Sequence, residues 1–262
     1  INNVQVKFLV MAESQSADNA LNLTIGEMVF DTLGDFYFVG SVPQFDSFHG
    51  WNLSDNSVKT PFLSKYLRNK THSWTIVPQM SNESVCEFTD LVIDDEYRLT
   101  IIGYYFGEVD FGNIRISSPL WEYNTFIAQA DGNGTWLWAH SLSQQPVSAV
   151  GPQRARSIDI DDQGIPAISW WSLDENGNTS VNVARVNQNN GSLHTTFSAR
   201  ALYPSHWHEL HAIIDGTDRI TITGSYNGTA SFGGINLTTD SFVDAFVARV
   251  NSSGWEWASS TI

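Results

Sequence analysis

The chain has 262 residues, with 13 Lys and Arg against 28 Asp and Glu, which gives a formal net charge of −15. Such an acidic surface disfavours nucleic acid or anionic lipid as a partner, because these polyanions reward clustered cations. Aromatic residues make up 13% and charged residues 16% of the chain, a composition typical of a folded, turn-rich β protein and not of a disordered one. We therefore expect one all-β domain or two small ones.

The first predicted element is a strand within residues 4–12. Val4, Val6, Phe8 and Val10 alternate with polar residues, so they share one face of an extended strand. Residues 13–21, "ESQSADNAL", read as a polar tether, and we define residues 1–20 as an N-terminal arm. Three fates are open: an added edge strand on the same subunit, strand addition to a neighbouring subunit, or disorder.

Residues 21–262 contain a fourfold internal repeat. Each copy has an apolar strand, an acidic turn and a second strand: "MVFDTLGDFYFVGSV", "LVIDDEYRLTIIGYY", "IDIDDQGIPAISWWS" and "IIDGTDRITITGSYN". The turn acids are Asp31, Asp94, Asp161 and Asp215, and we expect them to cap their own backbone amides. Nine residues after the turn acid stand Gly40, Gly103, Trp170 and Gly224.

Each copy continues with a third and a fourth predicted strand. The third strands are "FLSKY", "FIAQA", "NVARV" and "FVARV", and the fourth are "HSWTIV", "TWLWAHS", "LHTTFSA" and "GWEWASS". Copies two and four carry an insertion between the second and third strands that copy three lacks. We expect aromatics of the fourth strands, such as Trp138 and Trp257, to fill the wedge between neighbouring sheets.

Four short strands per repeat, separated by Gly, Asn and Asp turns, are typical of a propeller blade. The stretches "IIDGTDRITITGSYNGTASFGGINLT" and "DAFVARVNSSGWEWASS" also resemble the bacterial SBBP-type β-propeller repeat family. This resemblance implies a scaffold or binding surface without catalytic chemistry. The predicted fold is an all-β, four-bladed propeller over residues 21–262, and a fifth blade completed by the arm is the alternative.

Several features indicate an extracellular glycoprotein. The chain starts at Ile and holds one cysteine, Cys86, so we read it as an exported mature product or a trimmed one, without an intrachain disulfide. Asn-x-Ser/Thr sequons are more frequent than chance predicts. They begin at Asn22, Asn52, Asn69, Asn82, Asn133, Asn178, Asn190, Asn227, Asn236 and Asn251.

The most reactive-looking stretch is "SHWHELH". In an extended strand His206 and His208 share a face and are candidate metal ligands, although a polar loop explains the stretch equally. Alignment on the turn acids also places four polar residues at one equivalent position of the first strands: Glu27, Asp90, Ser157 and His211. We expect them to form a polar ring at the propeller axis, either as a ligand site or as a solvated lining.

Other chemistry is less well supported by the sequence. "DIDDQG", with Asp159, Asp161 and Asp162, has oxygen ligands for calcium but no bidentate Glu at the required distance. Trp51, Trp121 and Trp171 are candidate sugar-stacking platforms. No phosphate loop, nucleophile elbow or Cys–His pair occurs, and the carboxylates are too scattered to assign an acid/base pair.

The sequence therefore predicts a protein that is not an enzyme and needs no cofactor. The favoured function is a glycosylated structural subunit of a surface fibre or layer, polymerised through its N-terminal arm. The alternative is a monomeric propeller lectin or ligand-binding module.

Overall fold

The computed structural model describes residues 24–42, 47–48, 51–52, 59–119, 122–142, 154–173, 179–201, 207–215 and 218–260. These residues form strands and turns, without a helix, and so contain no helix long and apolar enough to cross a membrane. The all-β class predicted from the sequence is confirmed. The arm residues Val4, Val6, Phe8 and Val10 lie outside the described residues, so the arm stays a prediction.

The first two copies of the repeat each form a sheet. Sheet 1 has the order β1-β2-β5-β6, and sheet 2 has the order β8-β9-β11-β12, with β7 and β10 paired to the far half of the long β9. Their strands are β1 (Thr24–Phe30), β2 (Phe36–Val42), β5 (Thr60–Tyr66), β6 (His72–Ile76), β7 (Gln79–Met80), β8 (Val85–Ile93), β9 (Leu99–Phe111), β10 (Ile114–Ser118), β11 (Asn124–Ala130) and β12 (Trp136–Ser141). A two-stranded ladder pairs β3 (Ser47–Phe48) with β4 (Trp51–Asn52).

The last two copies form sheets 3 and 4. Sheet 3 has the order β13-β14-β15-β16-β19-β20, and sheet 4 has the order β17-β18-β21-β22. Their strands are β13 (Arg154–Ile160), β14 (Pro166–Leu173), β15 (Thr179–Val186), β16 (Leu193–Ala201), β17 (Trp207–Asp215), β18 (Arg219–Tyr226), β19 (Thr229–Phe232), β20 (Ile235–Thr238), β21 (Asp244–Asn251) and β22 (Gly254–Ser260). The four predicted strands of every copy are thus confirmed.

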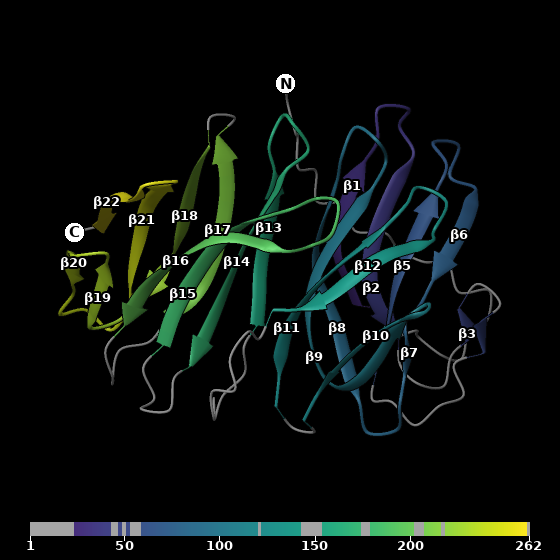
Figure 1. The fold of residues 1–262 in the computed structure, drawn as a ribbon, viewed down its shortest axis with the longest axis horizontal. Coiled ribbons are helices and arrows are strands. Elements are labelled where there is room, and N and C mark those ends of the chain that lie inside the picture. The colour runs from purple at the N-terminus through teal and green to yellow at the C-terminus, as the bar shows by residue number, and fades with distance from the viewer. Residues whose placement is uncertain are drawn as a thin grey trace.

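The four sheets stand in a row (Figure 1), with sheet 1 at one end and sheet 4 at the other. The first strands follow one another, β1 against β8, β8 against β13, and β13 against β17. One apolar cluster fills each of the three junctions, and a fourth cluster lies within sheet 1. We call the side of a sheet that faces the preceding sheet its leading face, and the other side its trailing face.

Three of the four turn acids act as the sequence predicts, and the cap expected of Asp215 stays a prediction. Asp31 Oδ1 accepts the amides of Leu33 and Asp35, both at 2.9 Å. Asp94 and Asp161 accept the amides two and four residues onward in the same way. The residue three places after each acid has positive φ: Gly34, Tyr97, Gly164 and Asp218.

The departure of copy three at Trp170 has a packing explanation. In the other copies the glycine of the second strand lies opposite a phenylalanine of the third strand, as in the pair Gly103 and Phe126. A Cβ on Gly103 would lie 2.6 Å from the Phe126 ring and 2.0 Å from a backbone oxygen. In sheet 3 the pair is Trp170 opposite Asn182, so the bulky side chain has moved from the third strand to the second. Each of these pairs therefore contains one large ring, either on the third strand or on the second.

The insertions of copies two and four are hairpins that reach back to the preceding sheet. The hairpin β19–β20 pairs with β16 of sheet 3, and the far half of β9, with β10, pairs with β7, which follows sheet 1. Each hairpin places a phenylalanine edge-on against a tryptophan of its own repeat copy, with ring centroids 4.8 Å apart for Phe111 and Trp136 and 5.0 Å apart for Phe232 and Trp255. The hairpins therefore connect neighbouring sheets.

Candidate functional site

A row of side chains crosses the trailing face of each sheet. In sheet 2 it runs Val92, Thr100, Gln129 and Trp138, since these residues are register partners on β8, β9, β11 and β12. Gln129 Nε2 donates to Thr100 Oγ1 at 3.0 Å, and Trp138 Nε1 donates to Gln129 Oε1 at 3.1 Å. The equivalent row of sheet 1 ends in Lys65 and Trp74, and that of sheet 4 in Arg249 and Trp257.

The tryptophans of sheets 1 and 2 close their junctions with the next sheet. Trp74 Nε1 donates to the carbonyl of Gly132 at 3.2 Å, and Trp138 Nε1 also reaches the carbonyl of Gln188 at 3.3 Å. Both carbonyls occupy the second position of the turn that joins the third and fourth strands of the next sheet. The wedge-filling role predicted for Trp138 is confirmed. Trp257 is 37% exposed, because no described sheet follows sheet 4.

The predicted axial residues lie on the first strands, and two of them bind the backbone of the next sheet. Asp90 on β8 accepts the amide of Ile158 on β13 at 2.9 Å, and Ser157 on β13 donates to the carbonyl of Ala212 on β17 at 3.3 Å. Glu27 on β1 is half-buried and His211 on β17 is exposed. These contacts give Asp90 and Ser157 a structural role between sheets, and a ligand-binding ring stays a prediction.

Asp90 is the most perturbed carboxyl group among the described residues. Burial raises the pKa of Asp90 to about 7, and the charges of Glu27 and Asp159 raise it further, while the amides of Ile158 and Leu91 lower it. Asp159 is itself engaged, since its Oδ2 accepts the amide of Ile214 at 2.7 Å. The inner strands are thus joined by carboxylate-to-amide bonds.

An acidic hollow of about 440 Å³ lies where the turns after β1, β8 and β13 meet, and its walls include Asp31, Asp94, Asp95, Asp161 and Asp162. Three of these carboxylates cap their own turns, and Asp161 also pairs with Arg185 Nη1 at 2.5 Å. Within the described ranges no group of three or more His, Cys, Asp or Glu is arranged to hold a metal ion. Calcium at "DIDDQG" therefore gains no support.

The remaining predicted site residues are placed as follows. His206 lies outside the described residues, and His208 is on β17 with no side-chain description, so the metal prediction is untested. Trp121 is outside the described residues and Trp51 is on β4. Trp171 is a half-buried residue of β14 whose ring has the Arg156 guanidinium 5.6 Å from its centroid, so part of its face is already occupied.

Most of the described sequons are accessible. Asn69, Asn82, Asn133, Asn190 and Asn236 are exposed. Half-buried sites are Asn227 and Asn251, Asn52 is on β4 without a side-chain description, and Asn22 and Asn178 lie outside the described residues. Cys86 is buried, and burial raises the pKa of its thiol, so it is an inert core residue.

Sequence reasoning missed the polar member of each trailing row. Lys65, Gln129, Arg185 and Arg249 stand at the same place in "FLSKY", "FIAQA", "NVARV" and "FVARV". A polar residue recurring next to the end of an otherwise buried strand was the signal that could have revealed these junction residues.

Comparison with known proteins establishes the class of fold. The chain is similar to a Hadza microbial sialidase, with 9% identity, a TM-score of 0.51 and coverage of 90% of this chain and 58% of that one. It is also similar to a Trypanosoma rangeli sialidase, with 14% identity, a TM-score of 0.51 and coverage of 91% of this chain and 36% of that one. A Dyadobacter fermentans protein of unknown function matches with 11% identity, a TM-score of 0.50 and coverage of 89% of this chain and 67% of that one. No protein-family model matches the sequence, and no curated protein is a significant match.

The fold is β-propeller-like. The chain spans little more than half the length of one sialidase and about a third of the other. At these identities the likeness concerns the fold alone, and it neither supports nor excludes the SBBP-type repeat family.

Proposed function

We propose that the chain is a non-enzymatic extracellular structural protein, a glycosylated subunit of a surface fibre or layer with four blades and an N-terminal strand-forming arm. On this proposal, copies join end to end, and the sheet 4 end of one copy meets the next copy. The supporting observation is that no described sheet covers the trailing face of sheet 4, which carries the row that elsewhere packs against a following sheet.

Exposed apolar side chains support contacts at the two ends of the row. Among the described residues, the large hydrophobic side chains that are exposed are Phe30, Leu33, Leu137, Ile213, Phe242, Val243 and Trp257. Four belong to sheet 4 or the loop before β21, two belong to sheet 1, and Leu137 alone lies in a middle sheet. Apolar surface gathered in this way is typical of association sites.

The occupant that we propose for the sheet 4 end is a second copy of this chain. The trailing-to-leading contact already occurs three times within one molecule, so the geometry that joins two sheets is built into the repeat. The outer edge of β22 is also unpaired within the described residues, and residues 4–10 of the next copy could pair with it. A contact between unlike ends is heterologous, and it extends into a fibre when it does not close a ring.

The state of the carboxylates supports a non-enzymatic role. Asp31, Asp90, Asp94, Asp159 and Asp161 all accept backbone amides. Groups fixed in this way hold turns and sheets together, and they are poor candidates for the facing acid/base pair that glycoside hydrolysis requires.

Electron microscopy and light scattering of the purified chain test the proposal. We expect the wild-type protein to form polymers, and Trp257→Ser and deletion of residues 1–12 to give shorter assemblies or monomers. The matched control is Leu137→Ser, which removes an exposed apolar side chain from a middle sheet and should assemble as the wild type does. A wild-type protein that stays monomeric at high concentration would overturn the proposal and favour the lectin alternative.

A further inference from the structure

One junction lacks the tryptophan that closes the others. In sheet 2 Trp138 immediately precedes Ala139, the register partner of Ala128; in sheet 3 Thr195 immediately precedes Thr196, the partner of Ala184. Ala128 and Ala184 are equivalent residues of the third strands. Thr195 therefore stands where the other sheets have Trp74, Trp138 and Trp257.

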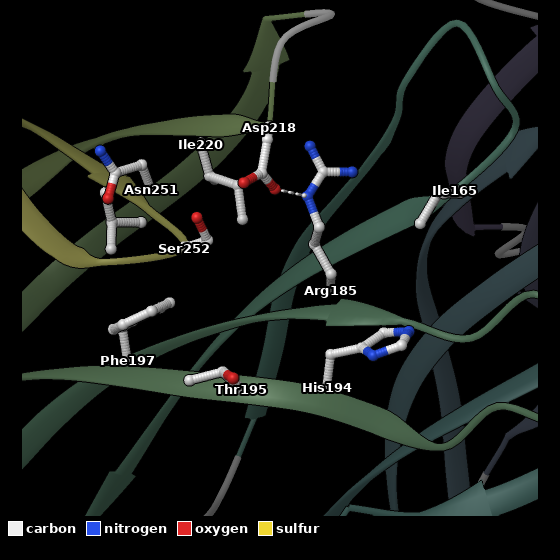
Figure 2. Close-up of a pocket in the computed structure, with 10 residues that line it drawn as sticks. Ile165, Arg185, His194, Thr195, Phe197, Asp218, Ile220, Asn251 and Ser252 are labelled. Atoms are coloured by element: carbon white, nitrogen blue, oxygen red, sulfur yellow. Dashed lines mark ion pairs between the residues drawn. The ribbon is translucent and has the colours of Figure 1, made fainter.

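An open slot of about 250 Å³ occupies this place between sheets 3 and 4. Figure 2 shows its walls, with Thr195 and Phe197 from β16, Arg185 from β15, and Ile220 and Ser252 from sheet 4. Ile165, Val250 and His194 complete much of the lining. For comparison, an apolar protein cavity of ~150 Å³ is enough to bind benzene.

The slot is lined by the equivalent of the residue whose backbone carbonyl binds the tryptophan indole at the other two junctions. Trp74 and Trp138 donate their indole N–H to the carbonyls of Gly132 and Gln188. The equivalent turn position in sheet 4 is Ser252, which lines the slot. An indole in the slot would therefore find a backbone carbonyl in the place where the other junctions provide one.

The charges of the slot restrict what else a ligand can carry. Arg185 Nη1 lies 2.5 Å from Asp161, and Arg185 Nε lies 3.0 Å from Asp218. One cation and two anions leave a local charge of −1, which disfavours an anionic ligand. Arg185 Nη2 is buried, so it is out of reach of a ligand that enters the open slot, and both reachable sides of the guanidinium are taken by carboxylates.

We propose that the slot between sheets 3 and 4 binds a neutral, indole-type aromatic molecule. The ring lies between the apolar side chains of Phe197, Ile220 and Val250. Its N–H donates to the Ser252 carbonyl, as the indoles of Trp74 and Trp138 donate to the equivalent carbonyls. The slot is independent of the proposed end-to-end contact, because it lies inside the row.

The test uses the full chain and indole-3-carbaldehyde, which is neutral and has an indole N–H. We expect saturation-transfer NMR and a concentration-dependent rise in Tm to report binding in the millimolar range. The anion indole-3-acetate should bind less tightly, because the local charge is negative.

Two variants at neighbouring positions locate the ligand. Thr195→Trp should fill the slot with the chain's own indole, raise the Tm and abolish the saturation transfer. The matched control Thr196→Trp places the same ring on the opposite, exposed face of β16 and should bind as the wild type does. Failure of the wild type to bind, or unchanged binding by Thr195→Trp, would overturn the proposal. The binding measurement does not depend on assembly, because we expect the wild-type protein to bind the ligand whether it is monomeric or polymeric. Failure of one proposal can therefore be told apart from failure of the other.

Discussion

Trp138 and Trp257 occupy equivalent positions in sheets 2 and 4, yet their surroundings differ. Trp138 is 8% exposed and hydrogen-bonds to sheet 3, whereas Trp257 is 37% exposed and has the Arg249 guanidinium 5.4 Å from its ring centroid. Their local sequences, "WLWA" and "WEWA", are nearly the same. The difference shows that the environment of this position depends on whether another sheet follows.

The largest expected effect is that of Trp138→Ala. Removing a buried indole leaves a cavity and two unpaired acceptors, and we expect the free energy of unfolding to fall by ~3–5 kcal/mol. Urea unfolding followed by circular dichroism measures this. A loss below ~1 kcal/mol would show that the junction between sheets 2 and 3 does not depend on the tryptophan.

Gly103→Ala tests the ring that distinguishes sheet 2 from sheet 3. A Cβ at Gly103 would lie 2.6 Å from the Phe126 ring and 2.0 Å from a backbone oxygen, so we expect a loss of ~1–3 kcal/mol in the free energy of unfolding. Gly26→Ala is the matched control, because its nearest neighbour is a Val39 methyl at 3.3 Å. Equal losses in the two variants would contradict the packing explanation for Trp170.

The sequence alone predicted the features that depend on contacts within one repeat, namely the strands and the turn caps. Apolar alternation predicted the strands, and Asp31, Asp94 and Asp161 were predicted to cap their turns because an Asx cap involves only neighbouring residues. The fourfold repeat also indicated the propeller-like fold, since all four copies give the same strand order.

Contacts between repeats could not be predicted in the same way. The pairing of β19 with β16, the bond from Asp90 to the Ile158 amide and the slot at Thr195 each join segments of different sheets. Such contacts depend on how sheets are placed against each other, which strand periodicity does not report. The sequence shows that copy three has Trp170 in place of glycine. That the smaller Asn182 lies opposite it, where the other copies have phenylalanine, could be known only from the strand register of the structure.

Asp90→Asn tests the bond between the inner strands of sheets 2 and 3. The folded-state pKa of Asp90 is raised to about 7, above its unfolded value of ~3.9. Between these two values the unfolded chain gives up its proton and the folded protein keeps it. Wild-type stability attributable to this group should therefore fall as pH rises from ~4 to ~7.

The variant should lose this part of the pH dependence. Between pH ~4 and ~7 we expect the free energy of unfolding of the wild type to fall by roughly 1–2 kcal/mol relative to that of the variant. The change is this small because water reaching the carboxyl and local relaxation reduce the cost of its ionisation. Unfolding free energies of both proteins at half-unit pH steps measure it. Parallel curves would show that Asp90 ionises in the folded protein as it does in the unfolded chain.

The smallest expected effect on stability is that of Trp257→Ala, the counterpart of Trp138→Ala. Trp257 is 37% exposed against 8% for Trp138, so its ring buries less apolar surface and leaves a smaller cavity when it is removed. We therefore expect the free energy of unfolding of the monomer to fall by only about 1 kcal/mol, measured by urea unfolding at low protein concentration. A loss as large as that of Trp138→Ala would mean that Trp257 is already packed within its own molecule, and the end-to-end contact would then have no ring to bury.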